Sequence, residues 1–139
     1  MATSPIFLLD TCAIIFLAGD IRIKPETGRT INRAAEKGEL YVSPISAWEI
    51  GLAVNRNRIN TTMAALDYFN AFVARTGAQL CSLAPEVLVN ATLLPGKLHK
   101  DPVDRMLIAS ARLNNHTLVT SDRAILAYGQ AGHVKIFAC

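Results

Sequence analysis

Short apolar runs alternate with helical segments along the chain, and this alternation restricts the possible folds more than any other feature. Five runs of three or four residues have the length and composition of strands buried within a sheet. When a helix connects two such strands they pair in parallel, because the helix returns the chain to the starting end of the sheet. The sequence therefore predicts a parallel sheet covered by helices. The expected strands are residues 6–9, 40–42, 80–83, 117–120 and 134–137.

Capping residues mark where the intervening helices begin. Pro102 suits the first helical position, and Asp101 before it is a natural N-cap. Ser46 and Glu49 have the spacing of a capping box at the start of another helix, and Thr62 is expected to cap the next one. The expected helices cover residues 12–18, 25–37, 47–54, 63–75, 85–93, 102–114 and 124–128, with a loop over 129–132.

The composition agrees with this architecture. Half of the residues (51%) are hydrophobic but only 6% are aromatic, so the core is built from aliphatic side chains and alanine. A chain of 139 residues fits one domain with a substantial core. We predict a single α/β domain over residues 1–139, with three layers (α/β/α) around a parallel sheet of four to five strands. Trp48 is expected in its core, and Phe69 and Phe72 in the core or on a dimer face.

Charge and cysteine content indicate which partners and which cellular compartment to expect for the protein. A net charge of +3 permits an anionic partner such as nucleic acid without requiring one. The cysteines Cys12, Cys81 and Cys139 are widely separated and form no C-x-x-C pair, which favours a reduced protein without a zinc site. The apolar residues 6–18 are interrupted by Asp10 and too short to span a bilayer. We therefore predict a soluble, cytoplasmic protein with no membrane partner.

Four carboxylates occur at positions that this fold brings to one edge of the sheet. Asp10 and Asp122 follow strands, whereas Glu49 and Asp104 lie near the starts of helices that follow in the chain. The carboxyl ends of parallel strands and the amino ends of the helices after them share an edge, where ligands bind. Carboxylates gathered there repel one another unless a cation lies among them. Their oxygen atoms favour Mg²⁺ or Mn²⁺.

A divalent cation held by carboxylates is suited to the hydrolysis of phosphodiesters. The ion lowers the pKa of a bound water, and a second ion about 3.5–4 Å away can stabilise the leaving oxygen. Two groups of basic residues are candidates for contacting a phosphate, one around Lys100 and the other formed by Arg56 and Arg58. Arg105 either pairs with a carboxylate or contacts a phosphate, and the sequence leaves both roles open.

Four motifs contain these acids and occur in order along essentially the whole chain. They are LLDT at residues 8–11, SPISAWEI at 43–50, HKDPVDRMLIA at 99–109 and LVTSD at 118–122. As a set, in this order and at similar spacing, they resemble the signatures of PIN-domain ribonucleases, in particular those of VapC-type toxins from bacterial VapBC toxin–antitoxin modules.

The resemblance implies a function, partners and site residues. It implies an Mg²⁺- or Mn²⁺-dependent endoribonuclease that cleaves RNA, is inhibited by a cognate antitoxin that also binds DNA, and commonly forms a homodimer. Cys12 stands where related toxins often carry His, and this change removes no metal ligand. The implied catalytic and metal-binding residues are Asp10, Glu49, Asp104 and Asp122, with Asp101, Thr11 and Ser121 as accessory residues and Arg105 and Lys100 as candidates for substrate binding.

Structural roles compete with the metal-binding role for each acid. Asp10, Asp101 and Asp122 can act as N-caps, and capping is the expected role of Asp101. Both roles are compatible, because a cap uses one carboxylate oxygen and leaves the other free. Two other functions were weighed. A phosphatase of the haloacid-dehalogenase type needs a second aspartate where Cys12 stands, and a catalytically inactive nucleic-acid or protein binding module would not need all four acids.

Overall fold

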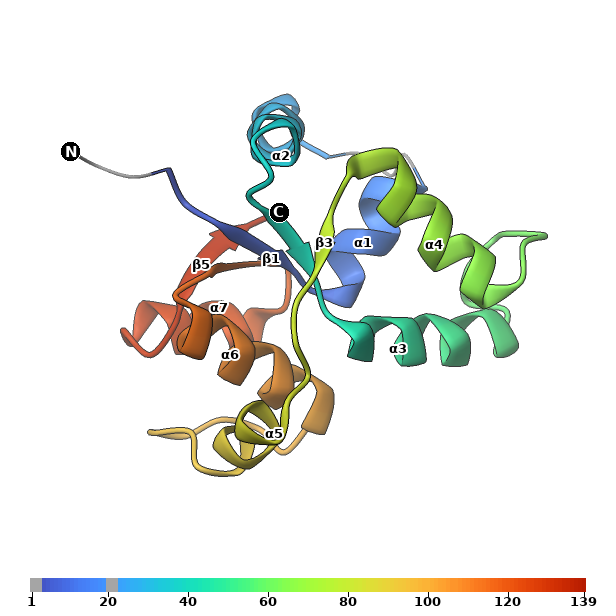
Figure 1. The fold of residues 1–139 in the computed structure, drawn as a ribbon. Helices are drawn as coiled ribbons and strands as arrows, with labels where there is room; N and C mark the ends of the chain where they lie inside the picture. The colour runs from blue at the N-terminus through green and yellow to red at the C-terminus, as the bar shows by residue number, and fades with distance from the viewer. Residues whose placement is uncertain (1–3, 20–22) are drawn as a thin grey trace.

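The computed structural model describes residues 4–19 and 23–139, in which strands and helices alternate as predicted (Figure 1). The strands are β1 (Phe7–Leu9), β2 (Leu40–Val42), β3 (Gln79–Leu80), β4 (Thr117–Thr120) and β5 (Lys135–Ala138). The helices are α1 (Thr11–Ala18), α2 (Pro25–Glu36), α3 (Pro44–Asn55), α4 (Ala65–Thr76), α5 (Pro85–Thr92), α6 (Pro102–Asn114) and α7 (Arg123–Gln130).

The five strands form one sheet in the order β3-β2-β1-β4-β5, and every neighbouring pair is parallel. The central strand β1 pairs with β2 on one side and β4 on the other, so that Leu8 lies opposite both Tyr41 and Leu118. All carboxyl ends of the strands therefore meet at one edge. The predicted three-layer α/β/α fold with a parallel sheet of four to five strands is confirmed.

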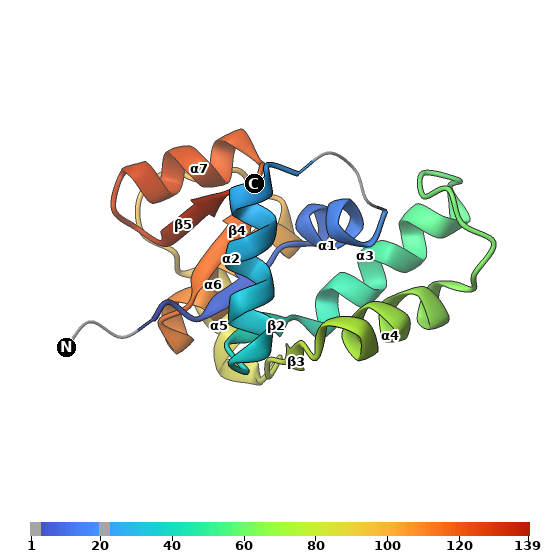
Figure 2. The same cartoon turned by 90° about the horizontal axis from the view of Figure 1, so that it is seen from above.

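Helices cover both faces of the sheet (Figures 1 and 2). Alternate residues of β1 point to opposite faces, as the pleat of a strand requires: Phe7 and Leu9 pack against α1–α4, whereas Leu8 packs against α6 and α7. These three side chains are at most 4% exposed, which is typical of a strand buried on both faces. Phe69 and Phe72 of α4 belong to the first of these cores.

Helix α3 begins three residues earlier than predicted, and this changes the role of Glu49. Ser43 is its N-cap and accepts a hydrogen bond from the backbone N–H of Ile45 (3.2 Å), while Pro44 occupies the first turn. The predicted capping box of Ser46 and Glu49 is therefore wrong. Ser46 lies in the first turn of the helix, and the carboxylate of Glu49 is not used at the helix start.

The predictions for Thr62 and Trp48 are also wrong. Helix α4 begins at Ala65 without a side-chain cap, and the hydroxyl of Thr61 accepts from the N–H of Met63 instead. Trp48 is 57% exposed, because α3 directs Ser46 and Ile50 into the protein and Trp48 lies on another face of the helix. A helix with apolar residues over much of its surface does not reveal its buried face through its pattern.

Two elements at the sheet edges differ in length from the prediction. The edge strand β3 has two residues, after which Pro85 starts α5. Helix α7 continues to Gln130, through part of the predicted loop 129–132, and Gly129 lies within it against Ile136 of β5. Glycine allows this close approach because it has no Cβ.

The described residues contain neither a disulfide nor a candidate membrane span. Cys12, Cys81 and Cys139 are free thiols, as their spacing predicted. None of the helices in residues 4–19 and 23–139 combines the length and apolar character needed to cross a bilayer.

We predict that Gly129→Ala lowers the free energy of unfolding by roughly 1–3 kcal/mol, because the new methyl group overpacks the α7–β5 contact. A Cβ at Gly129 would lie 2.5 Å from Cγ2 of Ile136, a branched side chain that cannot move aside freely. Urea unfolding measures the change. The matched control is Gly51→Ala in α3, where nothing lies within 4 Å of the added Cβ. Equal stabilities for the two variants would contradict the prediction.

Candidate metal and catalytic site

Asp10 joins the end of β1 to the start of α1. Its backbone N–H donates to the carbonyl of Val119 in β4 (3.0 Å), and its Oδ1 accepts from the N–H of Ala13 as the N-cap of α1 (2.7 Å). The residue is only 4% exposed. Burial raises the pKa of Asp10 to about 6; the negative charges of Glu49 and Asp122 add to this, while hydrogen bonds from Thr120 and Ala13 oppose it.

Asp122 occupies the equivalent position after β4. Its Oδ1 accepts from the N–H of Ile125 (2.9 Å) as the N-cap of α7, and its backbone N–H donates to the hydroxyl of Thr120 (3.0 Å). The expected cap is therefore present. One carboxylate oxygen makes the cap, and the other is available to a ligand.

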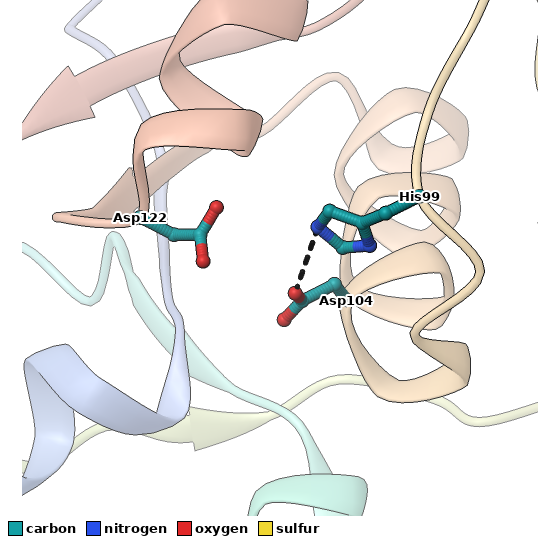
Figure 3. A group of neighbouring side chains, drawn as sticks. All are labelled: His99, Asp104 and Asp122. Atoms are coloured by element: carbon teal, nitrogen blue, oxygen red, sulfur yellow. Dashed lines mark ion pairs between the residues drawn. The ribbon is translucent and has the colours of Figure 1, made fainter.

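Asp104 lies in the first turn of α6, beside the N-cap Asp101. Oδ1 of Asp101 accepts from the N–H of Asp104 (3.1 Å), so the capping role expected for Asp101 is present. The carboxylate of Asp104 faces Asp122 and contacts the imidazole of His99 (Figure 3). Burial raises the pKa of Asp104 to about 7, with further increases from the charges of Asp101 and Asp122.

Glu49 reaches the same region from the second turn of α3. Its Oε1 accepts a hydrogen bond from the hydroxyl of Thr11, which is also hydrogen-bonded to Oγ of Ser46 (2.9 Å). Thr11 therefore holds the carboxylate in place from α1. Burial raises the pKa of Glu49, and the hydrogen bond from Thr11 partly offsets this.

These four carboxylates, which are far apart in the sequence, line one cavity of about 320 Å³ at the carboxyl edge of the sheet. The wall also includes Cys12 from α1 and two arginines, Arg56 and Arg58, from the α3–α4 loop. Burial, together with the surrounding carboxylates, raises the pKa of Cys12 to about 11, so its thiol is neutral at pH 7. The residues lining the cavity that bear on its chemistry are Asp10, Thr11, Cys12, Glu49, Arg56, Arg58, Asp104 and Asp122.

The donor set of this cavity fits a divalent cation. The only ion-pair contact of these four acids among the described residues is with a histidine, His99, so no lysine or arginine neutralises the group. One ligand atom each from His99, Asp104 and Asp122 lie within 4.8 Å of one another (Figure 3). Ligands that share one small divalent ion are about 2.0–2.2 Å from it, so a modest contraction would let the carboxylate oxygens of Asp104 and Asp122 share a single ion.

Several candidates from the sequence do not lie on the cavity wall. Asp101 is exposed and caps α6, and Lys100 is exposed beside it. Arg105 neither pairs with a carboxylate nor faces the cavity: its Nε donates to the carbonyl of Ala91 (2.8 Å) and its Nη1 to the carbonyl of His99 (3.4 Å). Ser121 follows β4 without lining the cavity. In the sequence His99 belongs to the basic group around Lys100 and has no ligand spacing, because its place beside Asp104 depends on the folding of a loop.

Fold and site together define a class of protein: a three-layer α/β domain whose parallel sheet gathers four carboxylates around one cavity at its carboxyl edge. The sequence model of the PIN domain matches residues 7–130. The chain therefore belongs to the PIN-domain family, as its four motifs predicted.

Individual relatives agree with this assignment. Ribonuclease VapC22 of Mycobacterium tuberculosis (strain ATCC 25618 / H37Rv) is 28% identical over 99 residues, which are 71% of this chain and 75% of that protein. The predicted resemblance to VapC-type proteins is thereby confirmed.

Solved structures share the fold. The crystal structure of VapBC2 from Rickettsia felis, bound to a DNA fragment from their promoter, contains a chain that matches with a TM-score of 0.71 at 13% identity. The match covers 96% of this chain and 98% of that one. The structure of FitAB bound to the IR36 DNA fragment matches with a TM-score of 0.56 at 16% identity, over 95% and 94% of the two chains.

The raised pKa of Asp10 predicts that the metal-free protein becomes less stable as the pH rises. Between the ordinary pKa of 3.8 and the folded value of about 6, the folded protein holds this proton more tightly than the unfolded chain does. The stabilisation is therefore complete below pH 3.8 and is lost as the pH rises through 6. Asn cannot ionise and still caps α1, so Asp10→Asn avoids the loss.

We expect Asp10→Asn to unfold at a higher temperature than the parent at pH 8 in EDTA. Its free energy of unfolding should exceed that of the parent by an amount on the order of 1–3 kcal/mol, and this difference should shrink towards pH 5. Thermal unfolding followed by circular dichroism measures this. Asp67→Asn, at an exposed position of α4, is the control. A variant less stable than the parent at pH 8 would refute the prediction.

Proposed function

We propose that this protein is a divalent-metal-dependent endoribonuclease and the toxin of a toxin–antitoxin module. The observation that carries the proposal is the convergence of Asp10, Glu49, Asp104 and Asp122 on one cavity. Membership of the PIN-domain family and the similarity to Ribonuclease VapC22 support it. An inactive binding module is disfavoured because all four carboxylates line the cavity, and Cys12 leaves a phosphatase of the haloacid-dehalogenase type without its second acid.

The four carboxylates hold Mg²⁺ or Mn²⁺, for which their oxygens are suited. When bound, the ion would supply an activated water and stabilise charge on the phosphate oxygens. The protein's own residues orient this site. Backbone N–H groups fix Asp10 and Asp122 through one oxygen each, and Thr11 fixes Glu49. The donors of the four acids are carboxylate oxygens, which Mg²⁺ prefers to a soft thiolate.

Arg56 and Arg58 contact the phosphates of the RNA beside the bond that is cleaved. Both line the acidic cavity, and both side chains are exposed. Asn57 between them adopts a left-handed conformation (φ 55°), and the N–H of Arg58 donates to the carbonyl of Ala53 (2.8 Å), which folds this loop back over the end of α3. Positive groups at the rim of an acidic cavity counter the repulsion that an RNA strand meets there. Lys100 remains a candidate for contacting a phosphate. Arg105 does not, because its side chain is hydrogen-bonded to the carbonyls of Ala91 and His99.

A cognate antitoxin is the expected protein partner. Two solved structures of similar fold are those of VapBC2 and FitAB bound to DNA, and by analogy an antitoxin binds this chain and the promoter DNA. We further propose that residues 1–139 form one domain, that the protein forms a homodimer and that it acts in the cytoplasm.

We predict that Asp104→Asn and Asp10→Asn each reduce the rate of RNA cleavage at least roughly a hundredfold, because a metal ligand contributes several kcal/mol to the transition state. Purified protein is incubated with labelled RNA and Mg²⁺ or Mn²⁺, and the products are resolved on gels. Circular dichroism confirms that the variants fold, and Asp67→Asn serves as the control. Undiminished cleavage by either variant contradicts the site assignment, and a parent inactive with both metals contradicts the nuclease proposal.

We predict that the double variant Arg56→Gln/Arg58→Gln raises KM for RNA several-fold and changes kcat less, because contacts to outer phosphates act equally in the ground and transition states. The slope of log(kcat/KM) against log salt should become shallower by roughly 0.7 per lost contact. Arg29→Gln, an exposed arginine on α2, is the matched control. Unchanged KM and salt dependence would show that neither arginine contacts the RNA and would contradict the prediction.

A further inference from the structure

His99 contacts the acidic cluster, and the proposed mechanism does not use it. It lies in the loop before α6, is half-buried, and its Nε2 is 3.3 Å from Oδ2 of Asp104. Figure 3 shows the imidazole beside the carboxylate of Asp104, with a dashed line for their ion-pair contact and Asp122 across from both. An imidazole at such a place has two possible tasks: to bind the metal ion or to hold a residue that does.

The loop that carries His99 is fixed at several points. The backbone N–H of Asp101 donates to Nδ1 of His99 (3.3 Å), and Nη1 of Arg105 donates to the carbonyl of His99 (3.4 Å). Nε of Arg105 also donates to the carbonyl of Ala91 at the end of α5 (2.8 Å). Through these contacts Asp101 and Arg105 both hold His99 beside the start of α6.

The hydrogen bond at Nδ1 determines what Nε2 can do. A ring nitrogen that accepts a hydrogen bond carries no proton, so Nδ1 is unprotonated and the single N–H of the neutral imidazole lies on Nε2. Nε2 lies 3.3 Å from Oδ2 of Asp104. A protonated nitrogen has no lone pair for a metal ion. The proximity of His99, Asp104 and Asp122 therefore does not make His99 a ligand.

We propose that His99 is a positioning residue for the metal site: its Nε2–H donates to Oδ2 of Asp104 and leaves Oδ1 directed at the cation. This inference rests on the metal site of the proposed function. Asp104 needs such a partner because Asp101 and Asp122 both repel its carboxylate, and rotation of its side chain towards solvent would relieve that repulsion. Hydrogen bonds of this kind orient ligating carboxylates, and removing them typically reduces metal affinity 10–100-fold.

Two substitutions separate the two nitrogens of the ring. In His99→Asn, the amide oxygen takes the place of Nδ1 and still accepts from Asp101, but nothing replaces Nε2. In His99→Gln, the amide nitrogen reaches the place of Nε2 and still donates to Asp104. His133→Gln, which alters a histidine stacked on Tyr128, is the matched control.

Calorimetric titration with Mn²⁺ and Mg²⁺, without RNA, is the first measurement. We expect His99→Asn to bind both ions about tenfold or more weakly, and His99→Gln to remain within about threefold of the parent, as His133→Gln does. Unchanged affinity in both His99 variants overturns the inference. So does a loss in both variants that affects Mn²⁺ much more than Mg²⁺, because imidazole ligands favour transition metals over Mg²⁺.

The imidazole ¹⁵N chemical shifts, recorded with and without Mg²⁺, provide a second, independent readout. We expect the Nε2–H tautomer of His99 in both states. A switch to the Nδ1–H tautomer on addition of Mg²⁺ would identify His99 as a ligand and refute the positioning role. A parent that binds neither ion overturns the proposed metal site together with this inference, whereas a parent that binds and cleaves RNA while His99→Asn behaves identically overturns this inference alone.

Discussion

Mutual repulsion among four carboxylates at one edge of the sheet is the constraint on which the rest of the site depends. Burial and neighbouring charges raise the pKa of Asp10 to about 6 and that of Asp104 to about 7, so the folded protein holds these charges at a cost in stability. Burial of the aliphatic cores on both faces of the sheet stabilises the fold and offsets this cost. A bound divalent cation would relieve this repulsion, and metal binding would therefore be coupled to the stability of the site.

The same local geometry places each of the three aspartates. Asp10, Asp104 and Asp122 all lie where a helix begins, and backbone N–H groups at these positions favour a negative side chain. Asp10 and Asp122 cap their helices with one oxygen, whereas Asp104 follows a separate cap, Asp101. Glu49 is different, because it reaches the cavity from the second turn of α3 and depends on Thr11 of α1 for its orientation. Helix starts thus provide both rigid placement and free oxygens.

Most of the fold could be predicted from the sequence, because strand length, helix caps and alternating order are local properties. Strands β2 and β4 and helix α6 have the predicted bounds, and Asp10 and Asp122 end up where a parallel sheet must bring them. The failures occurred where a competing local signal or a tertiary contact overrode the predicted pattern. Ser43 and Pro44 started α3 before the predicted capping box, and the burial of Ile50 left Trp48 exposed. Gly129 allowed α7 to continue against Ile136 through a predicted loop.

The sequence by itself determined the parallel α/β architecture and the four acids at its carboxyl edge, because hydrophobic periodicity and capping chemistry depend on neighbours along the chain. Only the tertiary structure decided which other side chains surround those acids. It turned Arg105 away to support a loop, brought Arg56 and Arg58 to the cavity, and set His99 against Asp104. The physical reason is that the direction of a loop side chain is set by contacts with distant elements, which no spacing along the chain encodes.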